Sequence, residues 1–153
     1  VFGMVEQELT LSFDELTALP AVEVTTDIHC VTKWSKFDTG WTGVRMRDLY
    51  KMAGASSSAT HVIMHGEHGY TANLQIDHTI GDDALVTWAY DGAPLEVDHG
   101  YPVRTLVPHL YLWKSVKWLR GIELADQDRP GFWEQNGYHN LGEPFAEQRF
   151  WGD

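Results

Sequence analysis

Short apolar segments, separated by Gly, Asp and Pro residues, recur along this chain and restrict the folds that it can adopt. Apolar runs of this length between turn residues are typical of β-strands. Residues 22–28 alternate between apolar and more polar side chains, which predicts a strand with one buried face. The further runs are Val62–Met64, Leu74–Ile76, Leu85–Tyr90, Val103–Val107 and Val116–Leu124.

Helices are predicted at two places, and both are short. Ser12 and Glu15 have the spacing of a capping box, which predicts a helix that ends before Pro20. The stretch from Val44 to Ala53 predicts a second helix, closed by Gly54. Because strands dominate and helices are few and short, we predict an α+β fold with mixed β-sheets.

The remaining segments are predicted to be turns and irregular chain. Residues 65–69 have the composition of a hairpin loop that leads into Tyr70. From about Gln127 the chain is rich in Gly, Pro and aromatic residues and shows little periodicity. A chain of 153 residues is long enough for one domain with its own core, so we predict a single domain over residues 1–153.

The charge of the chain restricts its partners. With 22 Asp and Glu against 11 Lys and Arg, the formal net charge is −11, and nucleic acid is not expected because its phosphates would be repelled. No apolar stretch approaches the roughly 20 residues that cross a bilayer, so no membrane span is predicted. The chain begins at Val1 and shows no signal peptide, which leaves open both an upstream segment and the compartment.

Cys30 is the only cysteine, which excludes an internal disulfide framework and a four-cysteine zinc site. It follows the predicted strand at residues 22–28, where a side chain can be presented to a ligand from a rigid support. His29 and Lys33 flank it and would favour the thiolate, a ligand for soft metals. The alternative, which composition alone favours, is a buried structural cysteine.

A second group of candidate residues lies in residues 98–119. Arg104, Lys114 and Lys117 place three cations within fourteen residues of a strongly acidic chain. Arg can hold a phosphate through two parallel hydrogen bonds, and Lys adds a point charge. Glycine and serine residues in the same segment would let backbone donors approach an anion closely. The segment therefore predicts an anion site, with a basic edge that pairs with surface carboxylates as the alternative.

Three segments together resemble the sulfite oxidase superfamily in order and spacing, over the chain from about Phe13 to the C-terminus. The His-Cys-Val-x-x-Trp-Ser motif at residues 29–35 is similar to the bacterial branch that includes the catalytic subunit of the periplasmic methionine sulfoxide reductase. Asp-His-Gly-Tyr-Pro-Val-Arg at residues 98–104 and Ser-Val-Lys-Trp-Leu at residues 115–119 are shared with sulfite oxidases, including the eleven-residue step between Arg and Ser. The third segment is the aromatic loop at residues 131–139.

The resemblance implies the superfamily's fold, a molybdenum–molybdopterin cofactor and an enzyme of sulfite oxidase type. The implied reaction is two-electron redox, of the oxygen-atom-transfer type, on a small oxygen- or sulfur-containing substrate. Cys30 falls on the molybdenum-binding cysteine, which makes it both metal ligand and catalytic residue. Tyr138 falls on a tyrosine that lines the substrate pocket and is the second catalytic candidate. The residues that fall on those holding the pterin and its phosphate are His99, Arg104, Ser115, Val116 and Lys117.

Two departures from the superfamily's pattern affect the prediction. Sulfite oxidases carry arginines just after the metal cysteine, whereas residues 31–35 contain none, and only Lys33 or the more distant Arg45 could take their place. The chain also has no Cys-x-x-Cys-His haem motif, so electrons are expected to pass to or from a separate partner.

Two other functions are weighed against this one. His61, His65 and His68 could form a zinc site of a hydrolase if a strand placed the first two on one face. The chain could instead be a non-catalytic cofactor-binding or docking module that serves another subunit. A serine hydrolase is disfavoured because no Gly-x-Ser-x-Gly motif occurs.

Overall fold

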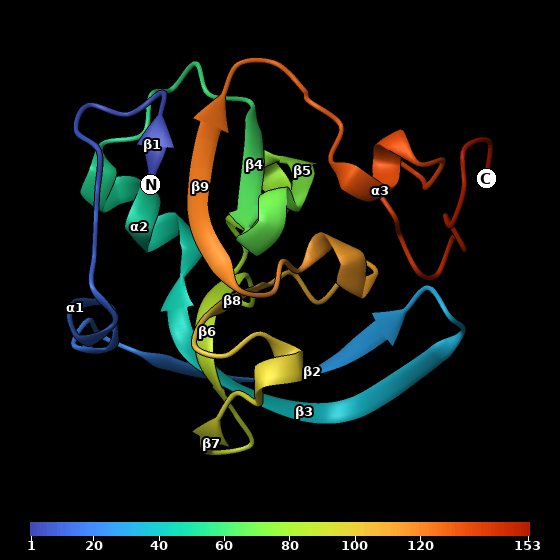
Figure 1. The fold of residues 1–153 in the computed structure, drawn as a ribbon, viewed down its shortest axis with the longest axis horizontal. Helices are drawn as coiled ribbons and strands as arrows, with labels where there is room; N and C mark the ends of the chain where they lie inside the picture. Colours follow the sequence, from blue (N-terminus) through green and yellow to red (C-terminus); the bar gives the residue numbers. More distant parts are fainter.

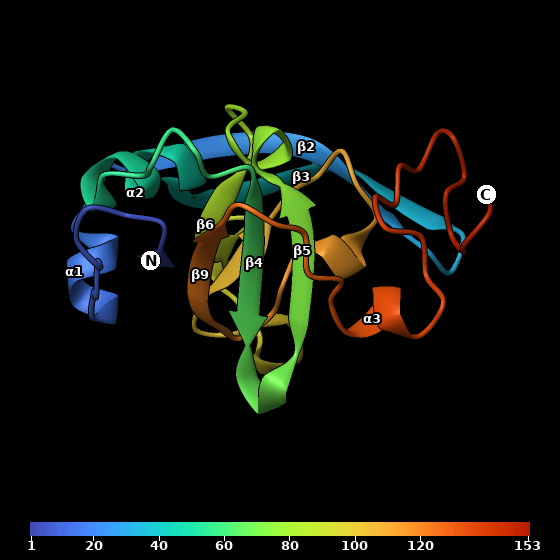
Figure 2. The ribbon, with the colours of Figure 1, turned by 90° about the horizontal axis from the view of Figure 1, so that it is seen from above.

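Two β-sheets form the frame of the protein, and their strands run across one another (Figures 1 and 2). The computed structural model describes all of residues 1–153. The first sheet contains β1 (Phe2–Gly3), β4 (His61–Gly66), β5 (Thr71–Gln75) and β9 (Leu119–Ala125), in the order β1-β9-β4-β5. The second contains β2 (Val22–Cys30), β3 (Trp34–Arg45), β6 (Leu85–Tyr90), β7 (Ala93–Pro94) and β8 (Arg104–Leu106), in the order β2-β3-β6-β7 with β8 beside β6. Pairing is antiparallel except between β1 and β9, so the first sheet is mixed.

The helices are short and lie at the edges of the sheets (Figure 1). The α-helices are α1 (Phe13–Thr17), α2 (Met46–Ala53) and α3 (Phe132–Gln135). Single 3-10 turns occur at η1 (Glu67–Gly69), η2 (Ile76–Thr79), η3 (Val97–His99) and η4 (Leu112–Lys114). None of these helices has the length and apolar character needed to cross a membrane. The predicted α+β class is confirmed.

The predicted helix ends are confirmed, but one predicted start is wrong. Ser12 Oγ accepts a hydrogen bond from the Glu15 amide at 3.1 Å, and the Glu15 carboxylate accepts one from the Ser12 amide at 2.7 Å, which completes the capping box. Gly54 closes α2 in the left-handed conformation, with φ of 68°. The second helix begins at Met46 instead of Val44, because Val44 pairs with β6 as part of β3.

Strand β3, of 12 residues, is the longest of the elements that the sequence patterns did not reveal. It reverses direction directly after Cys30 and pairs with β2 over most of its length, so that Cys30 lies opposite Trp34 at the tip of a long hairpin. Glycines within β3 weaken its strand pattern. One of them is required by packing, because a Cβ at Gly43 would lie 2.2 Å from the Val86 carbonyl oxygen. The hairpin carries Cys30 towards the C-terminal segment, where Arg149 Nε donates to the Val31 carbonyl at 3.3 Å.

One predicted turn is confirmed, and one predicted strand differs in extent. The loop between β4 and β5 is the predicted hairpin turn, with His68 and Gly69 both at positive φ. Strand β9 begins at Leu119 and not at Val116, because Trp118 adopts a φ of 50° and turns the chain before the strand starts.

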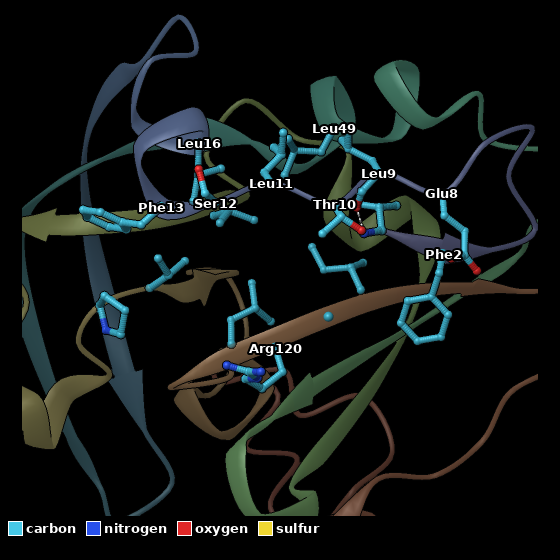
Figure 3. Close-up of a pocket in the computed structure, with 17 residues that line it drawn as sticks. Phe2, Glu8, Leu9, Thr10, Leu11, Ser12, Phe13, Leu16, Leu49 and Arg120 are labelled. Atoms are coloured by element: carbon cyan, nitrogen blue, oxygen red, sulfur yellow. Dashed lines mark hydrogen bonds between the residues drawn. The ribbon is translucent and has the colours of Figure 1, made fainter.

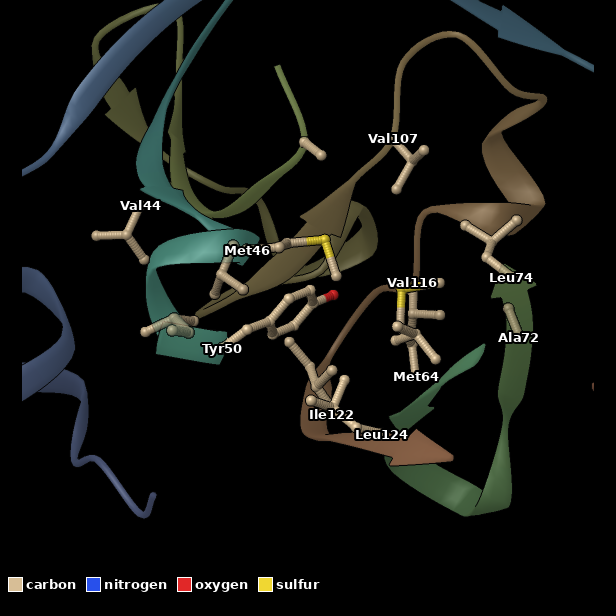
Figure 4. Packing of buried hydrophobic residues seen from close by; sticks show 14 of the residues in the cluster. Val44, Met46, Tyr50, Met64, Ala72, Leu74, Val107, Val116, Ile122 and Leu124 are labelled. Atoms are coloured by element: carbon tan, nitrogen blue, oxygen red, sulfur yellow. The ribbon is translucent and has the colours of Figure 1, made fainter. Parts of the chain in front are cut away.

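The main hydrophobic core lies where α2 and the facing sides of the two sheets meet (Figure 4). Met46 and Tyr50 of α2 pack towards Met64 of β4 and Leu124 of β9. The buried Tyr50 hydroxyl donates to Thr79 Oγ1 at 2.8 Å, which satisfies the polar end of this side chain. A smaller core lies on the second sheet and comprises Ile28, Trp41, Leu85, Leu95 and Leu106.

Replacing Met64 by Ala should lower the free energy of unfolding by about 2–5 kcal/mol, because its side chain is fully buried and the change leaves a cavity. Met52 is the matched control, since it is 49% exposed, and its replacement by Ala should change stability by no more than about 0.5 kcal/mol. Urea denaturation measures both. Equal effects of the two substitutions would contradict this description of the core.

Candidate functional site

A cavity of about 900 Å³ opens between the β2–β3 hairpin and the loops that connect β7, β8 and β9. In Figure 1 these loops lie between the lower end of β9 and the hairpin. The cavity brings together segments that are far apart in the sequence. Of the predicted site residues, those that line it are Cys30, His99, Arg104, Ser115 and Lys117.

Cys30 is held at the hairpin tip by local contacts. Its Sγ lies 3.0 Å from Thr32 Oγ1, and the neighbouring His29 Nδ1 lies 2.7 Å from Ser35 Oγ. The thiol is partly exposed and belongs to neither core cluster. The alternative of a buried structural cysteine is therefore wrong, and the thiol is available to a ligand in the cavity.

Arg104 is a buried cation in the cavity wall. Its side chain donates to the backbone carbonyls of Thr105, His99 and Ser115 at 3.2, 3.0 and 3.1 Å. A guanidinium carries five N–H donors, so these three bonds leave others for a ligand. Burial lowers the pKa of Arg104 to about 10, which still leaves it cationic at neutral pH. Arg104 thus connects the His99 turn to Ser115 and adds a positive charge between them.

Lys117 supplies a second cation at the same place. Its Nζ donates to the Asp98 carbonyl at 3.0 Å and lies 4.6 Å from the centre of the Trp118 ring. Burial and then the nearby Arg104 lower the pKa of Lys117, because both disfavour its charged form. An anion that neutralised the two cations would remove this repulsion.

The backbone of residues 115–118 differs in detail from the predicted cradle. The Ser115 amide donates to the Leu112 carbonyl, and the Val116 amide donates to Thr105 Oγ1 at 2.7 Å. Val116 itself is fully buried in the core. The amides that have no protein acceptor are those of Lys117 and Trp118, where the chain turns.

Gly100 lets these groups approach one another. It has a φ of 110°, and a Cβ there would lie 3.1 Å from the Lys117 Cβ and 3.2 Å from the Arg104 Cβ. Left-handed backbone and close packing both favour glycine at such a position. The result is a narrow cradle of two cations and free amides beside a large cavity, which fits an organic cofactor with a phosphate group.

Three other predicted residues lie elsewhere. Lys114, named among the cations of the anion site, is fully buried and forms an ion pair with Glu134 at 2.5 Å, so it does not face the cavity. Arg45 lies at the far end of β3, where it pairs with Asp82. Lys33 is in the hairpin turn and does not line the cavity.

Tyr138 packs behind the cavity wall and is not among its lining residues. Its ring contacts Trp113 and Trp133, with centroid distances of 5.2 and 4.9 Å. Its role as a catalytic residue stays a prediction.

The alternative of a zinc site at His61, His65 and His68 is wrong. No group of three His, Cys, Asp or Glu side chains in the protein lies close enough together to hold a metal ion. His65 instead contacts Glu123 at 2.9 Å, and His61 contacts Thr60 at the same distance. His68 lies on the hairpin turn, at the edge of the large cavity.

Sequence patterns missed several residues that line the cavity. Tyr70 follows the β4–β5 turn, and its hydroxyl donates to the Trp113 carbonyl at 2.7 Å. Lys36 of β3 lines the cavity with its Nζ 5.0 Å from the centre of the Tyr90 ring. Trp34 and Lys36 are two residues apart, so they lie on the same face of β3. A prediction of β3 as a strand would have placed both side chains on the face of Cys30's hairpin that lines the cavity.

A second cavity, of about 490 Å³, lies under the N-terminal segment (Figure 3). Leu9, Leu11 and Phe13 cover it, and Arg120 lies at its other side. Its lining is mostly apolar and includes none of the predicted site residues. It borders Val103, the residue before Arg104.

Comparison with known proteins identifies the group to which the chain belongs. The sequence model of the family described as oxidoreductase molybdopterin binding domain matches residues 1–133. The oxidoreductase YuiH of Bacillus subtilis is 47% identical over 153 residues, which cover 100% of this chain and 77% of that protein. The mitochondrial sulfite oxidase of Drosophila melanogaster is 30% identical over 159 residues, which cover 86% of this chain but only 28% of the fly enzyme.

The fold is also found in a solved structure. The sulfane dehydrogenase SoxCD of Paracoccus pantotrophus superimposes with a TM-score of 0.77 and 20% sequence identity, over 98% of this chain and 43% of that chain. This likeness confirms the predicted sulfite-oxidase-type fold, and the family match confirms molybdopterin as the cofactor. The chain belongs to the family of oxidoreductase molybdopterin-binding domains, as its resemblance to sulfite oxidases implied.

Proposed function

We propose that this chain is the catalytic domain of a molybdenum-dependent enzyme that carries out two-electron redox on a small oxygen- or sulfur-containing substrate. The observation that carries the proposal is that one cavity holds both the single thiol, Cys30, and the cationic cradle of Arg104 and Lys117. These groups come from separate segments, and each suits a different part of one cofactor. A thiolate is a ligand for a soft metal, and the cations suit a phosphate.

The residues divide the task of holding the cofactor. Cys30 would bind the metal through its thiolate, while Arg104 and Lys117 would bind the pterin phosphate together with the free amides of residues 117 and 118. His99 lines the cavity beside Gly100 and would contact the pterin. When bound, the cofactor supplies the two-electron redox chemistry and exchanges the oxygen atom. The protein supplies position, charge and exclusion of water.

The cavity wall around Cys30 favours an uncharged substrate. The lining residues that come from the hairpin tip, η4 and α3 are aromatic or aliphatic, and they are Val31, Trp34, Leu112, Trp113, Phe132 and Trp133. No arginine lies among them, in contrast to the arginines that follow the metal cysteine in sulfite oxidases. A sulfoxide fits this wall better than sulfite does. Its reduction takes two electrons and two protons, breaks the S–O bond and gives a thioether and water, with the electrons supplied by a separate protein donor.

The names of the relatives do not decide the substrate. One is a sulfite oxidase, and a nitrate reductase of Ulva prolifera is 29% identical over 91% of this chain. The chain spans only 28% and 19% of these two proteins, so the substrate is inferred from the cavity of this chain and not transferred from theirs.

Replacing Gly100 by Ala should release the cofactor, because the added methyl group would crowd Arg104 and Lys117. Gly92→Ala is the matched control: its φ of 79° is also positive, but nothing lies within 4 Å of the added Cβ. Both substitutions should cost about 1–2 kcal/mol of stability through backbone strain. Only Gly100→Ala should lose molybdenum and pterin during dialysis, as measured by elemental analysis and pterin fluorescence. Equal retention in both variants would contradict the cradle.

Replacing Cys30 by Ser should abolish turnover while changing the free energy of unfolding by less than about 1 kcal/mol, because the thiol is not part of the core. Protein from a host that makes the cofactor is analysed for molybdenum, zinc and pterin and is then assayed with a redox dye. Thr25→Ala, at an exposed position of β2 in the same hairpin and outside the cavity, should keep both metal and turnover. Full activity of the Cys30→Ser variant, or zinc without molybdenum in the unmodified protein, would refute the proposal.

The charge preference is tested with two sulfoxides that differ by one carboxylate, dimethyl sulfoxide and methylsulfinylacetate, both with reduced benzyl viologen as electron donor. The neutral compound should be reduced with a kcat/KM about tenfold or more higher, since none of the six aromatic and aliphatic side chains that form this wall offers the anion a charged partner. Val31→Arg, which places a cation beside Cys30, should reduce the ratio of the kcat/KM for the neutral sulfoxide to that for the anionic one. A faster reaction of the anion in the unmodified protein, or faster oxidation of sulfite by ferricyanide, would show that the substrate is charged.

A further inference from the structure

A buried polar cluster lies behind the aromatic side of the cavity and takes no part in the proposed chemistry. Lys114 and Glu134 are 0% and 1% exposed, and neither lines the cavity. Their ion pair is 2.5 Å long, and Lys114 Nζ also donates to the Asn73 carbonyl at 2.8 Å. Each ionic group therefore has a partner, but Glu134 Oε2 is buried without a hydrogen-bond partner, so the needs of the buried carboxylate are met only in part.

Glu134 joins this cluster to the cavity wall. Its Oε1 accepts a hydrogen bond from Trp113 Nε1 at 2.9 Å in addition to the contact with Lys114. Trp113 lines the cavity, so the orientation of its indole ring is set by a carboxylate outside the cavity. Glu134 belongs to α3, the one-turn helix that also carries the cavity residue Trp133.

Asn73 fixes the chain on both sides of α3. Its Nδ2 donates to Asp128 at 2.7 Å and to Asn140 at 2.9 Å, while its Oδ1 accepts from the Gly131 amide at 3.0 Å. Gly131 packs so closely that a Cβ there would lie 2.4 Å from the Thr71 carbonyl oxygen. Helix α3 is thereby held against β5, beside η4 in the view of Figure 1.

Stability alone does not account for the ion pair. Replacing a buried ion pair by apolar side chains of similar volume is often neutral or stabilising, whereas removing one partner is strongly destabilising. The pair does provide a directed hydrogen bond to Trp113, and it anchors the helix that carries Trp133.

We propose that Lys114 and Glu134 are positioning residues, which fix Trp113 and the helix of Trp133 as the aromatic wall facing the substrate. The expected effect on catalysis rests on the proposed function, whereas the expected effect on the position of Trp113 does not. A wall that is out of place weakens substrate binding and orientation, and misplacement by about 1 Å can reduce a rate about a hundredfold.

The test compares the unmodified protein, purified with its cofactor, with the double variant Lys114→Met/Glu134→Leu and with Glu134→Gln. Each protein is also made with Trp113→Phe, and the difference in acrylamide quenching within each pair isolates the signal of Trp113 from the other tryptophans. The double variant should remain folded, show stronger quenching of Trp113, and lose kcat/KM for dimethyl sulfoxide by about ten- to a hundredfold. Glu134→Gln retains an oxygen acceptor for the indole. It should therefore keep more of the protection of Trp113 from quenching, and more of the kcat/KM, than the double variant does.

A double variant that is folded and has unchanged quenching and unchanged kcat/KM would overturn the proposal. Unfolding of the double variant would also count against it, because the pair would then be required for the fold itself. If the unmodified protein lacks cofactor or turnover, the proposed function fails, while the quenching of Trp113 still decides whether the pair positions the ring.

Discussion

The rest of the site depends on the hydrogen bonds that hold the buried guanidinium of Arg104. A charge removed from water must be compensated by hydrogen bonds, and here three backbone carbonyls supply them. Those carbonyls belong to β8, to the turn at His99 and to the chain at Ser115. One side chain thus determines how two loops face each other, and Gly100 and Lys117 pack into the space that it defines.

The sheets and loops have different tasks in this fold. The sheets and α2 form the core and contribute few groups to chemistry. The thiol and the cations lie at strand ends and in turns, where the backbone can adopt unusual angles, as Gly100 and Trp118 do. Backbone strain of this kind is tolerated because the surrounding contacts hold the backbone in place. At Trp118 the strained turn leaves the amides of Lys117 and Trp118 without a protein acceptor.

The C-terminal segment completes the cavity through Phe132 and Trp133 of the short helix α3. Its position comes from the buried cluster of Asn73, Lys114 and Glu134, and from Arg149, which reaches the Cys30 hairpin through Val31. Polar contacts specify direction in a way that apolar packing does not. The acidic character of the whole chain, with a net charge of −11, is therefore compatible with a cationic cradle, because the few cations are placed individually.

Local patterns in the sequence determined the helix caps, most of the strands and the location of Cys30 at a strand end, since each depends on residues close in the chain. The order and spacing of the motifs also determined the family. Tertiary structure alone decided that β3 would form, since its pattern is interrupted by glycines that packing requires. It also decided the different environments of Lys114 and Lys117. These lysines are three residues apart, but the first lies in the core beside Glu134 and the second faces the cavity. An irregular turn separates them, so no periodicity in the sequence relates their directions.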